Sequence, residues 1–204
     1  MRVLSYGEDP LTYWALTQRL EEVFAQLGDP TSTNDAVVNY RPSFGRAAGP
    51  QFGEFDAVVG TSDKTYLIEA KWHGSPEISG GTVTLRPEQY KRHEIFRWYR
   101  KAWSEMAPND WDHFLETAGV AWAETYPDGR LAPSGSVLAR NLEFVLGQLS
   151  GCGPAEDVVL FVGLEGTAVP HAVGAASFRL VTLTYSGMAG TGYFELVAVG
   201  DSHQ

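Results

Sequence analysis

The stretch GEFDAVVGTSDKTYLIEAKW, residues 53–72, decides how the fold of this chain is interpreted. Its two apolar runs, AVV and YLI, are typical of buried strands, and the short polar segment between them predicts a hairpin. Asp56 opens the first strand, while Glu69 and Lys71 close the second. Charged side chains at the edge of a buried sheet need a partner or a chemical role.

The geometry of β-strands places the charged side chains of Asp56, Glu69 and Lys71 close together. Side chains two residues apart project from the same face, so Glu69 and Lys71 share a face with Leu67, and a plausible register places Asp56 beside Glu69. Two carboxylates about 4–6 Å apart repel each other, and a divalent cation such as Mg²⁺ relieves the repulsion. A lysine beside the cation can orient or deprotonate a water, or neutralise charge on a phosphate. The group therefore predicts metal-assisted phosphodiester hydrolysis.

The whole chain, residues 1–204, predicts a single mixed α/β domain with a central sheet flanked by helices. The expected elements are a helix at 10–27, strands at 36–42, 55–60 and 65–72, helices at 87–105 and 136–149, and strands at 157–164, 177–185 and 193–199. Residues 74–81 are expected to form a loop, and residues 106–135 have no clear assignment. The C-terminal strands either complete the sheet or build a second layer.

The sequence Gly53-Glu54-Phe55-Asp56, a gap of twelve residues and then Glu69-Ala70-Lys71 resembles the PD-(D/E)xK nuclease signature. The resemblance covers residues 10–105 and implies a restriction-endonuclease-like core of a helix, a three-strand meander, a helix and a further strand. It implies that Asp56 and Glu69 bind Mg²⁺ or Mn²⁺, that the Ala70 carbonyl helps, and that Lys71 is catalytic. Phe55 stands where the signature has proline.

Further site residues follow from the same resemblance. Many members of this superfamily carry a glutamine on the helix after the lysine strand, and Gln89 stands at that place. Some add a glutamate from the first helix, for which Glu21 or Glu22 is the candidate. Glu54 alternates onto the face of Asp56 and is either an additional acid or a solvated turn residue. His73 is a phosphate contact or an ordinary surface histidine.

The charge distribution points to a nucleic-acid partner. Residues 86–103 carry six Lys and Arg against two acidic residues, whereas the complete chain has a net charge of −10. Phosphate contacts provide most non-specific affinity for nucleic acid, so this helix is expected to bind DNA through its basic face. The expected contacts are Arg86, Lys91, Arg92 and Arg97. The alternative is a solvated basic face behind an aromatic stripe that packs on the sheet.

The cysteine content and the lengths of the apolar segments limit the class of protein to which the chain can belong. The single Cys152 excludes an intrachain disulfide and zinc sites built from several cysteines, and agrees with a reducing compartment. The N-terminal residues have no long apolar core of a signal peptide, and no apolar run is long enough to span a membrane. A soluble cytoplasmic protein is therefore expected.

Two other interpretations stay open at this point. The chain is compatible with a catalytically silent nuclease-like module that binds nucleic acid or a protein. It is also compatible with a different enzyme or interaction protein whose charges form a buried ion network. The acidic residues 104–204, with three basic and twelve acidic side chains, suit a protein partner. A homodimer agrees with the nuclease interpretation, because proteins of this fold often dimerise to cut both strands.

Overall fold

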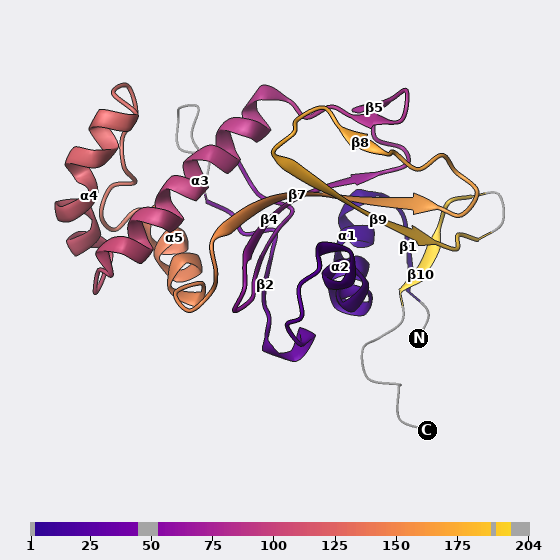
Figure 1. Cartoon of the computed structure of the whole chain (residues 1–204), viewed down its shortest axis with the longest axis horizontal. Helices are drawn as coiled ribbons and strands as arrows, with labels where there is room; N and C mark the ends of the chain where they lie inside the picture. Colours follow the sequence, from indigo (N-terminus) through magenta and orange to yellow (C-terminus); the bar gives the residue numbers. More distant parts are fainter. Residues whose placement is uncertain (1–2, 45–52, 189–190, 197–204) are drawn as a thin grey trace.

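The computed structural model describes residues 3–44, 53–188 and 191–196, and places a five-stranded mixed sheet at the centre of the molecule (Figure 1). In spatial order the strands are β2 (Val37–Tyr40), β3 (Ala57–Gly60), β4 (Thr65–Trp72), β7 (Ala155–Leu164) and β9 (Phe178–Tyr185). The first three form an antiparallel meander, and β7 and β9 continue the sheet in parallel pairing. The mixed α/β class is confirmed, and the strands predicted at 157–164 and 177–185 complete the central sheet.

The β3–β4 hairpin is held at its turn by a single side chain. The main-chain nitrogen of Thr61 donates to the Lys64 carbonyl at 2.8 Å, and the Thr61 hydroxyl accepts from the Lys64 nitrogen at 2.9 Å. This hydroxyl also donates to the buried Asp29 carboxylate at 2.7 Å. A polar turn with these bonds fixes the strand register.

One face of the sheet is covered by two helices where the sequence predicted one at 10–27. The structure has α1 (Glu8–Gln18) and α2 (Leu20–Leu27), separated at Arg19. The Arg19 side chain pairs with Glu22 and lies 5.1 Å from the centroid of the Trp14 ring. These local contacts stabilise the break, and Gly28 ends α2 in the left-handed conformation as expected.

The opposite face is covered by α3 (Pro87–Met106) and α5 (Val137–Gln148), with α4 (Trp111–Thr125) packed on both (Figure 1). The helices predicted at 87–105 and 136–149 are confirmed, and α4 lies in the segment without an assignment. Asp110 caps α4, and Ser136 caps α5, by accepting from backbone nitrogens in the first turn at 2.8 and 3.0 Å. Each sheet face thus has its own apolar core.

Two small sheets lie beside the central one. β1 (Val3–Ser5), which was not predicted, pairs with β10 (Phe194–Leu196), so the strand predicted at 193–199 does not join the central sheet, and its residues 197–199 lie outside the described ones. The predicted loop at 74–81 contains a strand instead. The second small sheet consists of β5 (Ile78–Ser79), β6 (Thr82–Val83) and β8 (Ala172–Val173).

The β5–β6 turn explains why that strand was missed. Gly80 and Gly81 have φ angles of +57° and +75°, the left-handed conformation that the tightest hairpin turns require at both central positions. The sequence Gly-Gly is therefore a hairpin signal here and not a loop. Within the described ranges, none of the helices combines the length and the apolar character needed to cross a membrane.

Candidate functional site

The site is built at the place where β3 begins and β4 ends. The register pairs Ala57 with Ile68, so the preceding residue Asp56 lies opposite Glu69, as predicted. Asp56 Oδ2 accepts a 2.7 Å hydrogen bond from the main-chain nitrogen of Ala70. Since the N–H and C=O groups of one strand residue point to the same side, the Ala70 carbonyl also faces the Asp56 side of β4.

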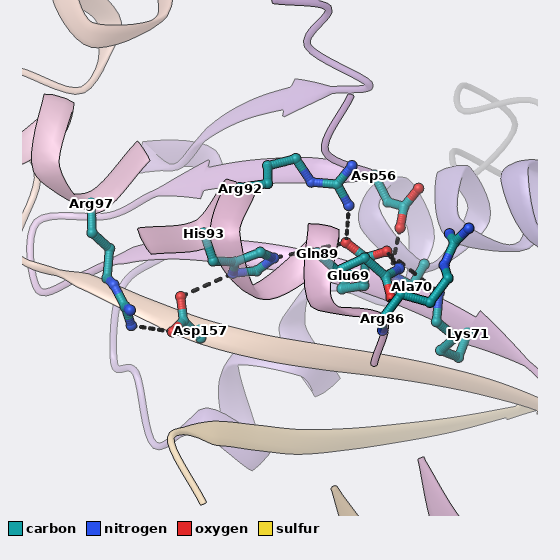
Figure 2. A network of polar contacts seen from close by, with 10 residues as sticks. All are labelled: Asp56, Glu69, Ala70, Lys71, Arg86, Gln89, Arg92, His93, Arg97 and Asp157. Carbon is teal, nitrogen blue, oxygen red and sulfur yellow. Dashed lines mark hydrogen bonds and ion pairs between the residues drawn. The ribbon is translucent and has the colours of Figure 1, made fainter. Parts of the chain in front are cut away.

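Glu69 is a buried carboxylate surrounded by donors (Figure 2). Lys71 Nζ lies 3.4 Å from Glu69 Oε1, and Arg92 Nη2 lies 2.6 Å from Oε2. Gln89 Nε2 also donates to Oε1. Glu69 and Lys71 are each 3% exposed, so these contacts are screened little by water. This contact between Glu69 and Lys71, and their place in one cavity, confirm that the two side chains share a face.

Gln89 has a local reason for its orientation. It is the third residue of α3, and its Oε1 accepts a 2.8 Å hydrogen bond from the main-chain nitrogen of Arg86. With its oxygen used in this helix cap, the amide can only present its nitrogen to the carboxylate of Glu69. The predicted place of Gln89 in the site, rather than on a solvated helix face, agrees with this geometry.

Asp56, Glu69 and Lys71 line a polar cavity of about 330 Å³. Its charged lining consists of five carboxylates and four cations: Glu8, Asp9, Glu54, Asp56 and Glu69 with Arg41, Lys71, Arg86 and Arg92. Arg92 passes close to Gly53, since a Cβ on Gly53 would lie 2.5 Å from Arg92 Nη1. Because so many charged side chains of both signs line this cavity, we take it as the candidate site.

Glu8 is an acidic residue of the site that sequence reasoning missed, as is its neighbour Asp9. Glu8 begins α1, lines the cavity and accepts a 3.0 Å hydrogen bond from the Ser75 hydroxyl. Burial raises the pKa of Glu8, while Lys71 and Ser75 oppose the rise. Glu8 was not considered a site residue because the first helix was predicted to begin at residue 10, and Glu8 lies before that position.

Glu21, the residue expected to supply an acid from the first helix, does not reach the site. It is exposed on α2 and lines a separate depression with Phe24 and Asp29. The prediction was wrong because Glu21 lies on the exposed side of α2, and the alternative Glu22 is also exposed and pairs with Arg19. Glu54 is at the cavity rim, where its carboxylate pairs with Arg41 at 2.8 Å, and Arg41 also pairs with Asp9.

The basic side chains of α3 and its cap differ in their surroundings. Arg86 is largely exposed at the cavity and lies 3.6 Å from Glu77, whereas Arg92 binds Glu69 inside it. Lys91 is exposed and lines another depression with Trp122 and Tyr126. Arg97 pairs with the buried Asp157.

Two other polar residues of the basic helix are buried. Arg100 is buried and donates to the carbonyls of Leu149 and Cys152, at 2.9 and 2.6 Å, so it does not belong to a basic face. His93 is fully buried, contacts Asp157, and lies with Gln89 at the Glu69 carboxylate. The aromatic stripe packs in the core, as predicted.

His73 lies next to the site in sequence but not in space. Its ring packs against Trp72 at 4.8 Å and Tyr185 at 6.0 Å between ring centroids, and it does not line the cavity. Of its two interpretations, the structure favours an ordinary histidine near the surface.

The two central carboxyls have pKa values displaced in opposite directions. Burial and the facing Glu69 raise the pKa of Asp56 to about 7, although the Ala70 N–H opposes the rise. Burial alone would raise the pKa of Glu69, but the facing His93 ring, Arg92 and Lys71 outweigh burial and lower it to about 2. Two adjacent carboxyls with such different proton affinity are typical of functional sites.

The donor set agrees with a hard divalent cation. Asp56, Glu69 and the Ala70 carbonyl offer oxygen atoms at one end of the β3–β4 pair, and oxygen atoms are the ligands that Mg²⁺ and Mn²⁺ prefer. Among the described residues, no three His, Cys, Asp or Glu side chains are grouped closely enough to hold a metal on their own. Such a cation would therefore take further ligands from water or phosphate. No family model, curated protein or solved structure matches this chain.

Proposed function

We propose that this chain is a divalent-metal-dependent DNA nuclease, an endonuclease that hydrolyses phosphodiester bonds. The observation that supports this most strongly is Asp56 facing Glu69 across the β3–β4 pair, with Lys71 Nζ 3.4 Å from Glu69 in the same cavity. The order of α1 and α2, the β2–β3–β4 meander, α3 and β7 also agrees with the restriction-endonuclease-like core that the sequence motif implies.

In this proposal the carboxylates of Asp56 and Glu69, with the Ala70 carbonyl, hold Mg²⁺ or Mn²⁺. A bound cation of this kind lowers the pKa of a water and stabilises charge on a phosphate. The Lys71 ammonium is held at the buried side of the cavity, where it orients the attacking water and offsets negative charge that develops around phosphorus. Gln89 keeps Glu69 and Lys71 in place through Glu69 Oε1.

Substrate binding is assigned to cations at the cavity. Arg86, which is 65% exposed at its side chain, and Arg92, which enters past Gly53, are the nearest donors for a DNA backbone. Lys91 and Arg97 lie further along α3 and would contact more distant phosphates. A homodimer in which each copy cuts one strand belongs to the same proposal, as does a protein partner on the acidic residues 104–204.

Cleavage of labelled DNA tests the proposal directly. Linear, circular, single-stranded and branched substrates are incubated with Mg²⁺ or Mn²⁺, using wild type, Lys71→Ala and Lys64→Ala. Lys64 precedes the same strand but pairs with Glu156 away from the cavity, so it is the matched control. Cutting by wild type and Lys64→Ala, with a loss of about 100-fold or more in Lys71→Ala, supports the nuclease. Equal cutting by all three proteins contradicts the role of Lys71.

One observation favours a second candidate, a nuclease-like module without catalysis. Lys71, Gln89 and Arg92 together engage both oxygens of Glu69, which is also the arrangement of a closed ion network. A folded wild-type protein that cuts no substrate and binds no Mn²⁺ by calorimetry would favour this candidate. Binding of the same DNA without cutting would then identify the module as a nucleic-acid-binding one.

A further inference from the structure

A buried line of polar side chains runs from the candidate site into the core (Figure 2). His93 Nε2 lies 3.8 Å from Glu69 Oε2, and His93 Nδ1 lies 2.9 Å from Asp157 Oδ1. The second Asp157 oxygen pairs with Arg97. Three structural elements therefore meet through one ring, because Glu69 belongs to β4, His93 to α3 and Asp157 to β7.

The His93 ring is fixed from both sides. It is fully buried, and its centroid lies 4.9 Å from that of Phe55 and 4.8 Å from that of Phe178. A ring between two phenylalanines cannot change its direction without displacing core side chains. The Nε2 atom therefore has a fixed direction toward the Glu69 carboxylate.

Asp157 determines which atom of the ring faces Glu69. Asp157 Oδ1 lies 2.9 Å from His93 Nδ1, so Nδ1 faces Asp157 and the other ring nitrogen, Nε2, faces Glu69. Asp157 is itself 2% exposed and held by Arg97, and the strand register pairs it with Leu67, two residues before Glu69. The β4–β7 pairing thus places this second carboxylate behind the ring.

His93 differs from the other partners of Glu69 in one respect. The Arg92 side chain is 14% exposed, has a long flexible stem and is able to turn toward a phosphate in the cavity. His93 Nε2 stays 3.8 Å from Glu69 Oε2, because the ring is held between Phe55 and Phe178 and cannot leave. It is the constant neighbour of the Glu69 carboxylate.

We propose that Asp157, acting through His93, is a positioning residue that sets the orientation of the Glu69 carboxylate for a divalent cation. This inference rests on the proposed function, because it assigns Glu69 as a metal ligand. Loss of a group that orients a metal ligand weakens metal affinity by about 10–100-fold, even though no direct ligand is removed.

The test compares His93→Phe and Asp157→Asn with wild type and with His73→Phe. The phenylalanine keeps the ring between Phe55 and Phe178 but removes both nitrogens. His73→Phe is the matched control, because His73 also packs on aromatic rings but does not line the cavity. Mn²⁺ affinity is measured by calorimetry, folding by metal-free thermal melts, and DNA cleavage over a series of Mn²⁺ concentrations.

The expected result is Mn²⁺ binding about 10–100-fold weaker in His93→Phe and Asp157→Asn, and unchanged in His73→Phe. Saturating Mn²⁺ should restore kcat in the variants, which an unfolded or damaged protein would not show. Unchanged Mn²⁺ affinity in a folded His93→Phe or Asp157→Asn protein overturns the positioning role while the nuclease proposal stands. A wild-type protein that binds no Mn²⁺ overturns both. If one variant does not fold, the other gives the same decision.

Discussion

The Asp56 carboxyl lies opposite the Glu69 carboxyl on neighbouring antiparallel strands, and only Glu69 is surrounded by cationic side chains. Asp56 has the main-chain nitrogen of Ala70 as its hydrogen-bond donor. The two carboxyls therefore have pKa values of about 7 and about 2. This asymmetry means that one member of the pair holds a proton readily and the other stays ionised.

Replacement of Asp56 by alanine should abolish Mn²⁺ binding and leave the fold intact. One of the two carboxylate ligands is lost, so we expect affinity to fall by on the order of 100-fold or more. The fold should persist because removing one repelling carboxyl relieves the facing Glu69. Calorimetry with Mn²⁺ and a metal-free melt measure the two effects. A variant that unfolds outright would instead point to a structural ion network.

The stability of the metal-free protein should fall as pH rises from about 4 to about 7. The folded pKa of Asp56 is raised from 3.8 to about 7, so in this window the folded state holds a proton that the unfolded state has lost. Replacement of Asp56 by asparagine should flatten this fall and raise Tm at pH 8 by about 2–4 °C, the shift from about 1 kcal/mol in a domain of this size.

Glu69 makes the opposite contribution to the pH dependence. Its folded pKa is lowered from 4.5 to about 2, so its stabilisation is present above about pH 4.5 and is lost as pH falls toward 2. Thermal melts from pH 2 to 8 in the presence of a chelator measure both effects. A Tm that rises steadily from pH 4 to 7 in wild type would contradict the raised pKa of Asp56.

Glu8 should matter where Glu21 does not. Glu8→Gln keeps the size of the side chain but removes a carboxylate from the cavity, and we expect Mn²⁺ affinity or cleavage to fall by about 10-fold. Glu21→Gln, made on the neighbouring helix, is the matched control, because Glu21 lines a different depression. Equal effects of the two substitutions would rule out a specific role of Glu8.

Arg86 should contribute a phosphate contact. Its side chain is exposed at the cavity, so Arg86→Ala should weaken DNA binding and reduce the slope of log affinity against log salt by about 0.9, the value for one phosphate contact. The control is Lys101→Ala, near the far end of α3, where Lys101 is exposed and pairs with Glu105 at 3.5 Å. DNA affinity is measured at several salt concentrations with a chelator present. A reduced slope in Arg86→Ala but not in Lys101→Ala supports the phosphate contact of Arg86.

Short-range features were predictable from sequence because they depend on local geometry. The alternation of side chains along residues 65–72 placed Glu69 and Lys71 on one face, and the turn at Thr61 brought Asp56 beside Glu69. The helix predicted to begin at residue 87 begins there, and Pro87 occupies the first helical position, where proline is favoured. These signals lie within a few residues of the groups that they position.

Other boundaries were missed because the sequence pattern was ambiguous. A continuous apolar stripe at residues 10–27 does not show that the backbone leaves the helical conformation at Arg19, where φ is −129° and ψ is 16°. The Gly-Gly turn before β6 was compatible with a plain loop until β8 supplied a parallel partner. α4 is a long helix that the sequence did not reveal, in a segment of mixed composition.

The sequence by itself determined the hairpin, the common face of Glu69 and Lys71, and the neighbouring Asp56, because strand periodicity and turn chemistry act over short distances. Only the tertiary structure decided that Glu8 and Ser75, 67 residues apart, meet at the site, and that His93 and Asp157, 64 residues apart, meet behind it. Strand order and helix packing bring such groups together, and neither can be predicted from the local spacing of the residues involved.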